Sequence, residues 1–236
     1  MTSDDRTVRK SAVGHALVTG AASGIGNAIA ARLLADGWRV TGLDRTMIEP
    51  TSDRFRAISV DLSDDESLRS ALASLRDISA FVHAAGFMRT APLGELDPAD
   101  GAAMWRVHVD AAIAIANTLI PTMPSGGRVV LIGSRTASGA AGRSQYAASK
   151  AALYGLARSW AAEMAPKGVT VNVVAPGATE TPMLSDPARQ GVKPRMPPIG
   201  RFIRPEEIAA LTAFLLGPEA SAITGQQIVV CGGGSI

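Results

Sequence analysis

The sequence has one cysteine, little excess charge and no long hydrophobic run, and each shortage excludes a class of protein. Cys231 is the single cysteine, which excludes a disulfide framework within the chain and fits a reducing compartment. The net charge is +2 with both signs scattered, which gives no basis for nucleic-acid binding. No stretch approaches the length of a membrane span, and residues 1–11 lack the apolar run of a secretory signal. We therefore expect a cytoplasmic protein that binds neither nucleic acid nor a membrane.

Length and composition indicate one α/β domain. Of the 236 residues, 47% are hydrophobic and 19% charged, which is typical of a globular domain with a substantial core. Apolar runs alternate with helical segments, and this predicts a doubly wound parallel sheet of about seven strands flanked by helices. The predicted strands are 16–19, 38–43, 55–60, 79–82, 127–132, 169–174 and 226–230. Residues 12–236 form the predicted domain, after a flexible tail at 1–11.

A glycine-rich turn lies between the first predicted strand and the following helix. The stretch Gly20-Ala21-Ala22-Ser23-Gly24-Ile25-Gly26 opens directly into a segment of helical composition. Glycines permit tight turns and close backbone approach, and a helix N-terminus favours an anion. The glycine spacing differs from the usual dinucleotide fingerprint. In its strand–turn–helix context we interpret the stretch as a phosphate-binding loop, and the alternative is an ordinary turn.

Acidic residues end the next two predicted strands. Asp44 lies near the distance from the loop at which an acid holds the ribose 2′-OH of a dinucleotide. Such a carboxylate repels the extra phosphate of NADP, so NAD is the predicted cofactor and NADP is less favoured. The adjacent Arg45 would soften that preference, and a surface-turn Asp is the alternative. Asp61, followed by Leu62, either reaches the adenine or caps the next helix.

Tyr146 and Lys150 lie four residues apart in a predicted helix at 145–164, so they share one face. A neighbouring positive charge lowers the pKa of a phenol from ~10 and lets it exchange a proton with an oxygen. Alone this spacing is a weak signal, because it also occurs on solvated helix faces.

Other stretches should converge at the carboxyl ends of the strands, where ligands bind in such sheets. These stretches are 20–26, Asp44, Asp61, 83–86, Ser134 and 176–181.

Several motifs, in this order along the chain, resemble the short-chain dehydrogenase/reductase family. They are Thr19-Gly20-x-x-x-Gly24-x-Gly26, Ala84-Ala85-Gly86, Ser134, Tyr146-x-x-x-Lys150 and Asn172-Val173-Val174-Ala175-Pro176-Gly177. The resemblance implies a Rossmann fold, a nicotinamide cofactor, and hydride transfer between that cofactor and an alcohol or carbonyl. It also implies a homotetramer, or a homodimer, in which helices at 97–120 and 145–164 pack between subunits.

The resemblance implies roles for single residues as well. Tyr146 would be the general acid/base, Lys150 would lower its pKa and hold the nicotinamide ribose, and Ser134 would orient the substrate oxygen. With the loop and the acids above, the predicted cofactor-binding residues are Gly20, Ser23, Gly24, Ile25, Gly26, Asp44, Arg45, Asp61, Leu62, Ala84, Ala85, Gly86, Tyr146, Lys150, Pro176, Gly177, Thr179 and Thr181. No metal site is predicted.

Three positions depart from the family pattern. His83 stands where the family has a leading Asn, and Ser134 lies one residue closer to Tyr146 than usual. The family's fourth catalytic residue is an Asn on the helix after the fourth strand, and it aligns with Asp110. We predict that Asp110 replaces this Asn in a proton relay; the alternative is a helix-surface Asp or a misalignment. His83 is predicted to pack near the adenosine.

The substrate pocket should be partly apolar, with a mobile loop at 185–200. Its predicted wall residues are Phe87, Met88, Arg135, Ala141 and Met183. A partly apolar pocket favours a medium-sized cyclic or aromatic alcohol, and Arg135 is either a carboxylate partner or solvated. The segments 40–44, 84–89 and 172–183 also resemble the dihydrodiol branch of the family, which implies a dihydrodiol as substrate. One alternative is a 3-oxoacyl-carrier-protein-type reductase, and another is a non-catalytic NAD(H)-binding redox sensor.

Overall fold

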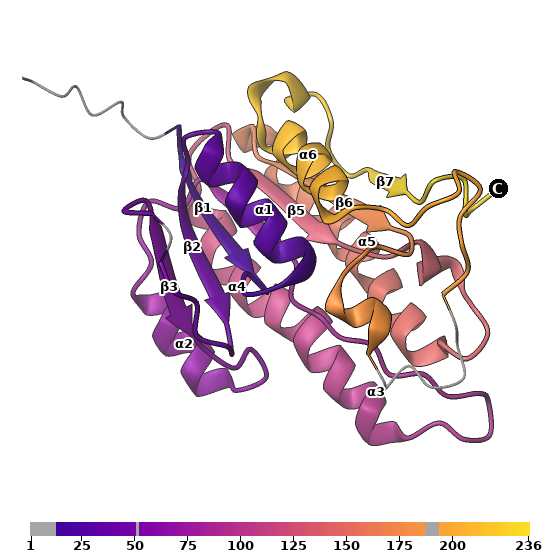
Figure 1. Ribbon diagram of the computed structural model, residues 1–236. Helices are drawn as coiled ribbons and strands as arrows, with labels where there is room; N and C mark the ends of the chain where they lie inside the picture. Colours follow the sequence, from indigo (N-terminus) through magenta and orange to yellow (C-terminus); the bar gives the residue numbers. More distant parts are fainter. Residues whose placement is uncertain (1–12, 51, 187–193) are drawn as a thin grey trace, which may run out of the picture.

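Seven strands form one parallel sheet in the order β3-β2-β1-β4-β5-β6-β7 (Figure 1). The computed structural model describes residues 13–50, 52–186 and 194–236, so the predicted tail at 1–11 and part of the predicted mobile loop lie outside the described residues. The strands are β1 (His15–Thr19), β2 (Arg39–Asp44), β3 (Phe55–Ser59), β4 (Ala80–His83), β5 (Arg128–Ile132), β6 (Thr170–Pro176) and β7 (Gln227–Val230). The predicted single-domain, doubly wound Rossmann fold is confirmed.

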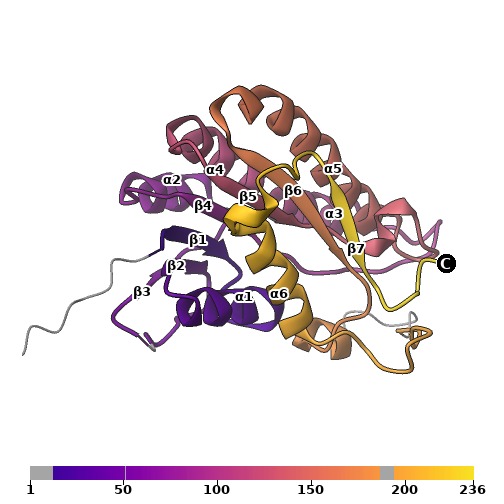
Figure 2. The same ribbon diagram turned by 90° about the horizontal axis from the view of Figure 1, so that it is seen from above.

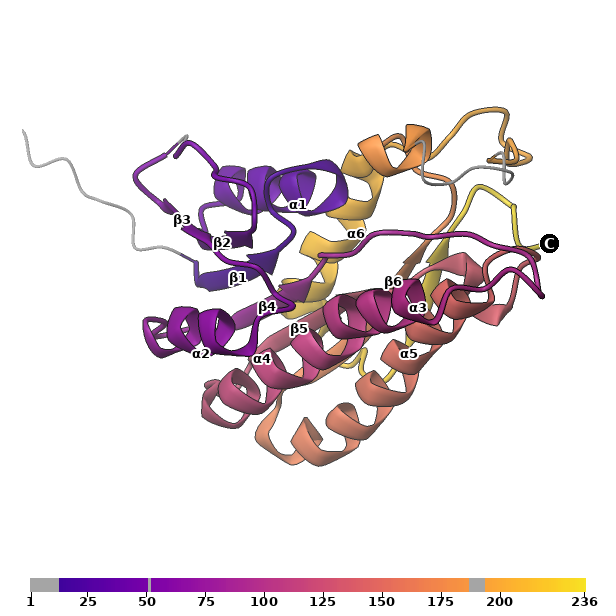
Figure 3. The same ribbon diagram turned by 90° about the horizontal axis from the view of Figure 1, so that it is seen from below.

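Helices cover both faces of the sheet. They are α1 (Gly24–Ala35), α2 (Asp65–Ala73), α3 (Pro98–Trp105), α4 (Ala111–Leu119), α5 (Ser144–Met164) and α6 (Pro205–Leu216). Helices α1 and α6 pack on one face, whereas α2, α4 and α5 pack on the other (Figures 2 and 3). In the described segments, every helix is too short or too polar to cross a lipid bilayer.

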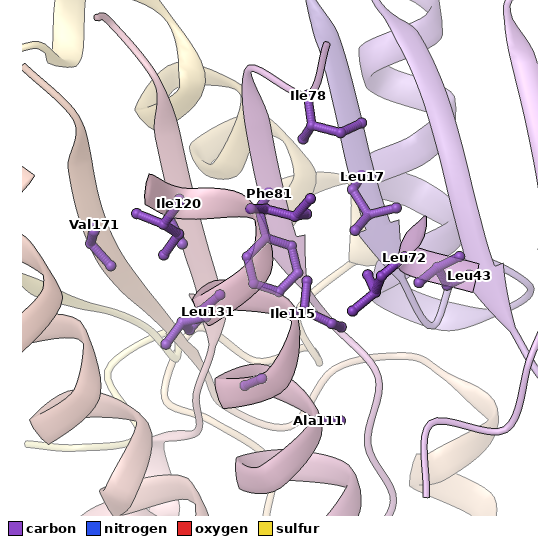
Figure 4. Close-up of a cluster of buried hydrophobic side chains, with 14 of the residues drawn as sticks. Leu17, Leu43, Leu72, Ile78, Phe81, Ala111, Ile115, Ile120, Leu131 and Val171 are labelled. Atoms are coloured by element: carbon purple, nitrogen blue, oxygen red, sulfur yellow. The ribbon is translucent and has the colours of Figure 1, made fainter. Parts of the chain in front are cut away.

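Alternating strand residues supply the two halves of the core. Leu17 and Phe81 lie on the α4 side of the sheet, whereas Val18 and Val82 lie on the α1 side. Figure 4 shows Phe81 surrounded by apolar side chains that come from neighbouring strands and from α4, Ile115 among them. Because both faces are covered, the strands read as continuous apolar runs, which is why they could be located from the sequence.

The helix predicted at 97–120 contains a π turn. Helix α3 continues into the π turn η1 (Arg106–Asp110) and then into α4. Within it the amide of Ala111 donates to the carbonyl of Arg106, five residues back, rather than to that of Val107. The extra residue turns His108 toward the sheet, where it is fully buried, and leaves Asp110 exposed.

Short 3₁₀ turns complete the chain and hold segments near the strand ends. They are η2 (Ile120–Thr122), η3 (Arg135–Ser138), η4 (Ala165–Lys167), η5 (Pro182–Ser185) and η7 (Pro218–Ala220). The buried side chain of Asn172 on β6 donates to the carbonyl of Ile223 at 2.7 Å and accepts from the amide of Gln226 at 3.1 Å. These two bonds fix the start of β7 against β6.

Candidate active site

A cavity of about 1170 Å³ runs along the carboxyl ends of the strands. Its wall contains every predicted catalytic and cofactor-binding residue except Gly26 and Asp110. The predicted wall residues Phe87, Met88, Arg135 and Met183 also line it, whereas Ala141 does not. Stretches that are far apart in the sequence therefore meet at one edge of the sheet, as expected for this topology.

The glycine loop is built by contact between its own two ends. Gly26 does not line the cavity because it packs beneath the loop, where any Cβ would collide with the carbonyl of Gly20. Gly20 itself has φ +70°, the left-handed region that glycine adopts without strain. Helix α1 then begins at Gly24 with no acidic residue in its first turn. Its N-terminus thus lies at the cavity with no acidic side chain in its own first turn to oppose a phosphate.

The Asp44 carboxylate bridges the glycine loop and the end of β2. One oxygen accepts from the amide of Ala22 at 3.0 Å and the other from the amide of Thr46 at 2.9 Å. Both bonds hold the carboxylate in one orientation at the cavity wall, beside Arg45. The geometry is that of a preset acceptor for hydroxyl groups.

Asp61 also lies at the cavity wall, and it does not cap α2. Its carboxylate accepts from the amide and the hydroxyl of Ser63, and these bonds lower the pKa of Asp61. The capping residue is Asp64, which accepts from the amides of Glu66 and Ser67. Of the two predicted roles, the structure gives capping to Asp64 and leaves Asp61 facing the cavity.

Tyr146 and Lys150 share the inner face of α5 and are almost fully buried, with 5% and 4% of their surface exposed. The Lys150 ammonium donates to the carbonyl of Ile132, at the end of β5, at 2.9 Å. Burial lowers the pKa of Lys150 to about 7. The helix thus carries a phenol and a cation into the cavity from the same side.

Ser134 follows β5 and is held by a residue that the sequence did not single out. Its hydroxyl oxygen accepts from the amide of Thr136 at 3.1 Å and shares a hydrogen bond with the Thr136 hydroxyl at 2.8 Å. When Thr136 donates in that pair, the hydrogen of Ser134 is available to a ligand in the cavity. Nothing in the spacing of the motif indicates this second hydroxyl.

The structure does not bring Asp110 into the site. Its side chain is exposed and is absent from the cavity wall, because it lies two positions after His108 and hence on another side of the helix. His108 lies beside the predicted pair instead, edge-on to the Tyr146 ring with centroids 5.7 Å apart. The predicted relay through Asp110 is therefore wrong. No periodic signal marked the π turn that selects His108.

The prediction for His83 is also wrong. This side chain is fully buried and does not line the cavity in which the adenosine was expected. Its ring nitrogens hydrogen-bond the hydroxyl of Thr19 at 3.0 Å and the carbonyl of Val107 at 3.1 Å. Burial and then the charge of Lys150 lower the pKa of His83 to about 3. His83 thus joins β1, β4 and the π turn as a neutral group.

Comparison with known proteins agrees with this geometry. A family model described as enoyl-(acyl carrier protein) reductase matches residues 20–235. The chain is 35% identical over 234 residues to the 3-oxoacyl-[acyl-carrier-protein] reductase FabG of Salmonella typhimurium, covering 92% of this chain and 96% of that protein.

Solved structures give the same result. A short-chain dehydrogenase from Burkholderia cenocepacia in complex with NADP is 34% identical, with a TM-score of 0.83 over 94% of this chain and 97% of that one. A 3-ketoacyl-(acyl-carrier-protein) reductase from Brucella melitensis complexed with NADH is 26% identical, with a TM-score of 0.85 over 95% and 99%. Sequence similarity along nearly the whole chain, together with this fold, shows that the protein belongs to the short-chain dehydrogenase/reductase family.

Proposed function

We propose that this oxidoreductase transfers a hydride between a nicotinamide cofactor and a secondary alcohol or ketone. The observation that carries the proposal is the meeting of Ser134, Tyr146 and Lys150 with the glycine loop around one cavity. A hydroxyl, a phenol and a cation beside a phosphate-binding turn are the groups that this chemistry needs from a protein.

The cavity wall fits a nicotinamide dinucleotide. The start of α1 would hold the pyrophosphate, and Asp44 would accept hydrogen bonds from the adenosine ribose. Lys150 would hold the nicotinamide ribose, and Thr179 and Thr181 would position the carboxamide near the Pro176-Gly177 backbone. When bound, the cofactor supplies or accepts the hydride.

The protein's own side chains would donate and accept the proton that accompanies hydride transfer. Ser134 would donate to the substrate oxygen and orient it, since Thr136 can occupy the other side of the serine hydroxyl. Tyr146 would give its proton to that oxygen in reduction and take it in oxidation. The nearby Lys150 ammonium would stabilise the phenolate and so lower the pKa of Tyr146.

We propose NAD as the preferred cofactor. The Asp44 carboxylate is fixed by two amides at the cavity wall, and there it would repel a 2′-phosphate, because like charges close together raise the energy of the complex. Arg45 beside it opposes this preference in part. Family members use both cofactors: the Burkholderia structure contains NADP and the Brucella structure NADH.

We propose a medium-sized cyclic or aromatic alcohol, or a dihydrodiol, as substrate. Phe87, Met88 and Met183 make part of the cavity wall apolar. The half-buried Arg135, next to Ser134, offers a cation to a substrate carboxylate. The second candidate is a 3-oxoacyl thioester, because the chain is similar to 3-oxoacyl-[acyl-carrier-protein] reductases along nearly its whole length.

We also propose assembly into a homotetramer through the surface of α4 and α5. Trp105, at the end of α3, and Ile113, on α4, are more than 40% exposed, although both side chains are large and apolar. Burying such groups against a second copy would be favourable.

Replacing Tyr146 with Phe should lower kcat about a hundredfold or more, the usual range for loss of a general acid/base. Turnover is followed by cofactor absorbance with cyclic alcohols, dihydrodiols and 3-oxoacyl thioesters, and the panel identifies the substrate class. Tyr154→Phe is the matched control, since it makes the same change on the same helix outside the cavity wall. Cofactor binding without turnover of any substrate would favour the redox sensor over the enzyme.

Replacing Asp44 with Ser should lower the preference for NAD over NADP by at least about tenfold, because one fixed negative charge is removed. The readout is the ratio of kcat/KM for the two cofactors, together with their dissociation constants from protein fluorescence. Arg45→Ala serves as the opposing variant and should raise the same ratio. A wild-type protein that prefers NADP would contradict the proposed role of Asp44.

Replacing Lys150 with Met should abolish turnover but stabilise the cofactor-free protein at pH 7. The folded pKa is about 7 and the ordinary value is 10.5, so between these limits the unfolded chain binds more protons. The free energy of unfolding contributed by Lys150 therefore rises with pH through that window. Urea titrations at several pH values should show the advantage of Lys150→Met shrinking as pH rises. Lys167→Met, at an exposed position, is the control. A Lys150→Met protein that is less stable than the unaltered protein at pH 7 would contradict the lowered pKa of Lys150.

Sedimentation velocity should show a particle of about four chain masses, dissociated by Ile113→Glu because a carboxylate would be buried in the interface. Leu93→Glu, which changes a fully exposed side chain on a loop, should leave the mass unchanged. A single-chain particle for the unaltered protein would rule out the tetramer.

A further inference from the structure

His108 is a buried imidazole whose two hydrogen bonds each run in only one direction. The amide of Phe87 donates to Nε2 at 3.1 Å, and an amide can only donate, so Nε2 carries the lone pair. The hydrogen therefore lies on Nδ1, which donates to the Ser149 hydroxyl oxygen at 2.9 Å. The Ser149 hydroxyl in turn donates a hydrogen bond to the backbone carbonyl of Tyr146 at 2.9 Å.

This chain of bonds joins the substrate side of the cavity to the helix that carries the phenol. Phe87 lies on the segment after β4 and lines the cavity, whereas Ser149 lies between Tyr146 and Lys150 on α5. The imidazole also packs edge-on against the Tyr146 ring, and a Cβ on Gly86 would lie only 2.8 Å from its Nε2. The ring is therefore held on several sides, in one plane and one tautomer.

The second buried histidine supports this arrangement with the opposite tautomer. The Val107 carbonyl, which the π turn separates from the amide of Ala111, accepts from Nε2 of His83. Nδ1 of His83 then accepts the hydrogen of the Thr19 hydroxyl, whose oxygen is occupied by the amides of Ala84 and Ala85. The backbone on which His108 sits is thus fixed from the sheet side.

We propose that His108, as its Nδ1–H tautomer, is a positioning residue for the reaction: it sets the place of Tyr146 through Ser149 and that of the substrate wall through Phe87. The inference rests on the proposed function. The family uses Asn in this part of the fold, and an Asn amide is too short to span both partners of His108. The two hydrogen bonds would separate two tasks, orientation of the phenol and shape of the substrate wall.

Two variants separate the two bonds. His108→Asn places an amide donor near the Nδ1 position, which keeps Ser149 bonded and leaves the Phe87 amide unbonded. His108→Gln places a carbonyl near the Nε2 position, which keeps Phe87 bonded and leaves Ser149 without its donor. We expect Asn to raise the substrate KM about tenfold with kcat within about threefold, and Gln to lower kcat about tenfold with KM within about threefold.

Ser149→Ala tests the path to the phenol. It should lower kcat as His108→Gln does, and the double variant should be no worse than either single one, because both remove the same link. His15→Gln is the matched control: it removes a partly buried imidazole on β1, away from the cavity wall, and should leave both kinetic constants unchanged. The contrary result is that His108→Asn and His108→Gln share the same fall in kcat and the same rise in KM, in proportion to their lost thermal stability. That result would show that the role of His108 is merely structural.

Nuclear magnetic resonance tests the same proposal without turnover. The chain has three histidines and two tyrosines, so labelled side chains give few signals. Nitrogen shifts at neutral pH should show the Nδ1–H form for His108 and the Nε2–H form for His83. The Tyr146 ring signal should move in both His108 variants, because each removes the imidazole that packs edge-on against it. Ser149→Ala keeps that ring and breaks only the link to α5, so a Tyr146 signal that also moves in this variant, with Tyr154 as reference, tests the path through Ser149. An Nε2–H or charged His108 would overturn the proposal, even if the protein proved to be a non-catalytic cofactor binder.

Discussion

A buried ammonium group is the constraint on which the site depends. Lys150 is almost fully enclosed, and the hydrogen-bond partner that the sheet gives it is a backbone carbonyl, that of Ile132. Removing a charge from water is costly unless compensating groups are present, so the surroundings of Lys150 must be ordered and free of a second cation. Both neighbouring histidines meet this condition, because burial and the Lys150 charge keep their pKa values well below neutrality. Burial of this charge lowers the stability of the fold, and it places a cation on the same face of α5 as the Tyr146 phenol.

The sequence predicted those features that depend on local chemistry. Strands buried on both faces read as apolar runs, and the glycine loop is marked by residues that its own backbone requires, such as Gly26 beneath Gly20. Tyr146 and Lys150 were recognisable because helix geometry places residues four apart together. Ser134 and 176–181 were expected at the carboxyl ends of the strands from the alternation of strands and helices, and the family resemblance supplied their roles. These residues were brought together by a topology that alternating strands and helices determine.

The residues that were missed depend on nonlocal or irregular geometry. A π turn adds one residue to a helical turn without changing composition, so nothing at 106–110 showed that His108 rather than Asp110 would face the site. Thr136 gains its place only because a 3₁₀ turn folds its hydroxyl back onto Ser134. His83 was placed near a ligand because it precedes a ligand-binding strand end. Strand alternation instead points it away from the cavity, toward Thr19 and Val107.

The two histidines also define which groups can titrate in the site near neutrality. Each is held in a single neutral tautomer by partners whose direction is fixed, so neither can serve as a proton donor to substrate without losing a hydrogen bond. Asp110 lies outside the site, and burial keeps the pKa values of both histidines low, whereas the pKa of the neighbouring Lys150 falls to about 7. An asparagine has no charge state to suppress, whereas an imidazole does. Replacing one by the other therefore requires the burial and the matched hydrogen bonds that this fold provides.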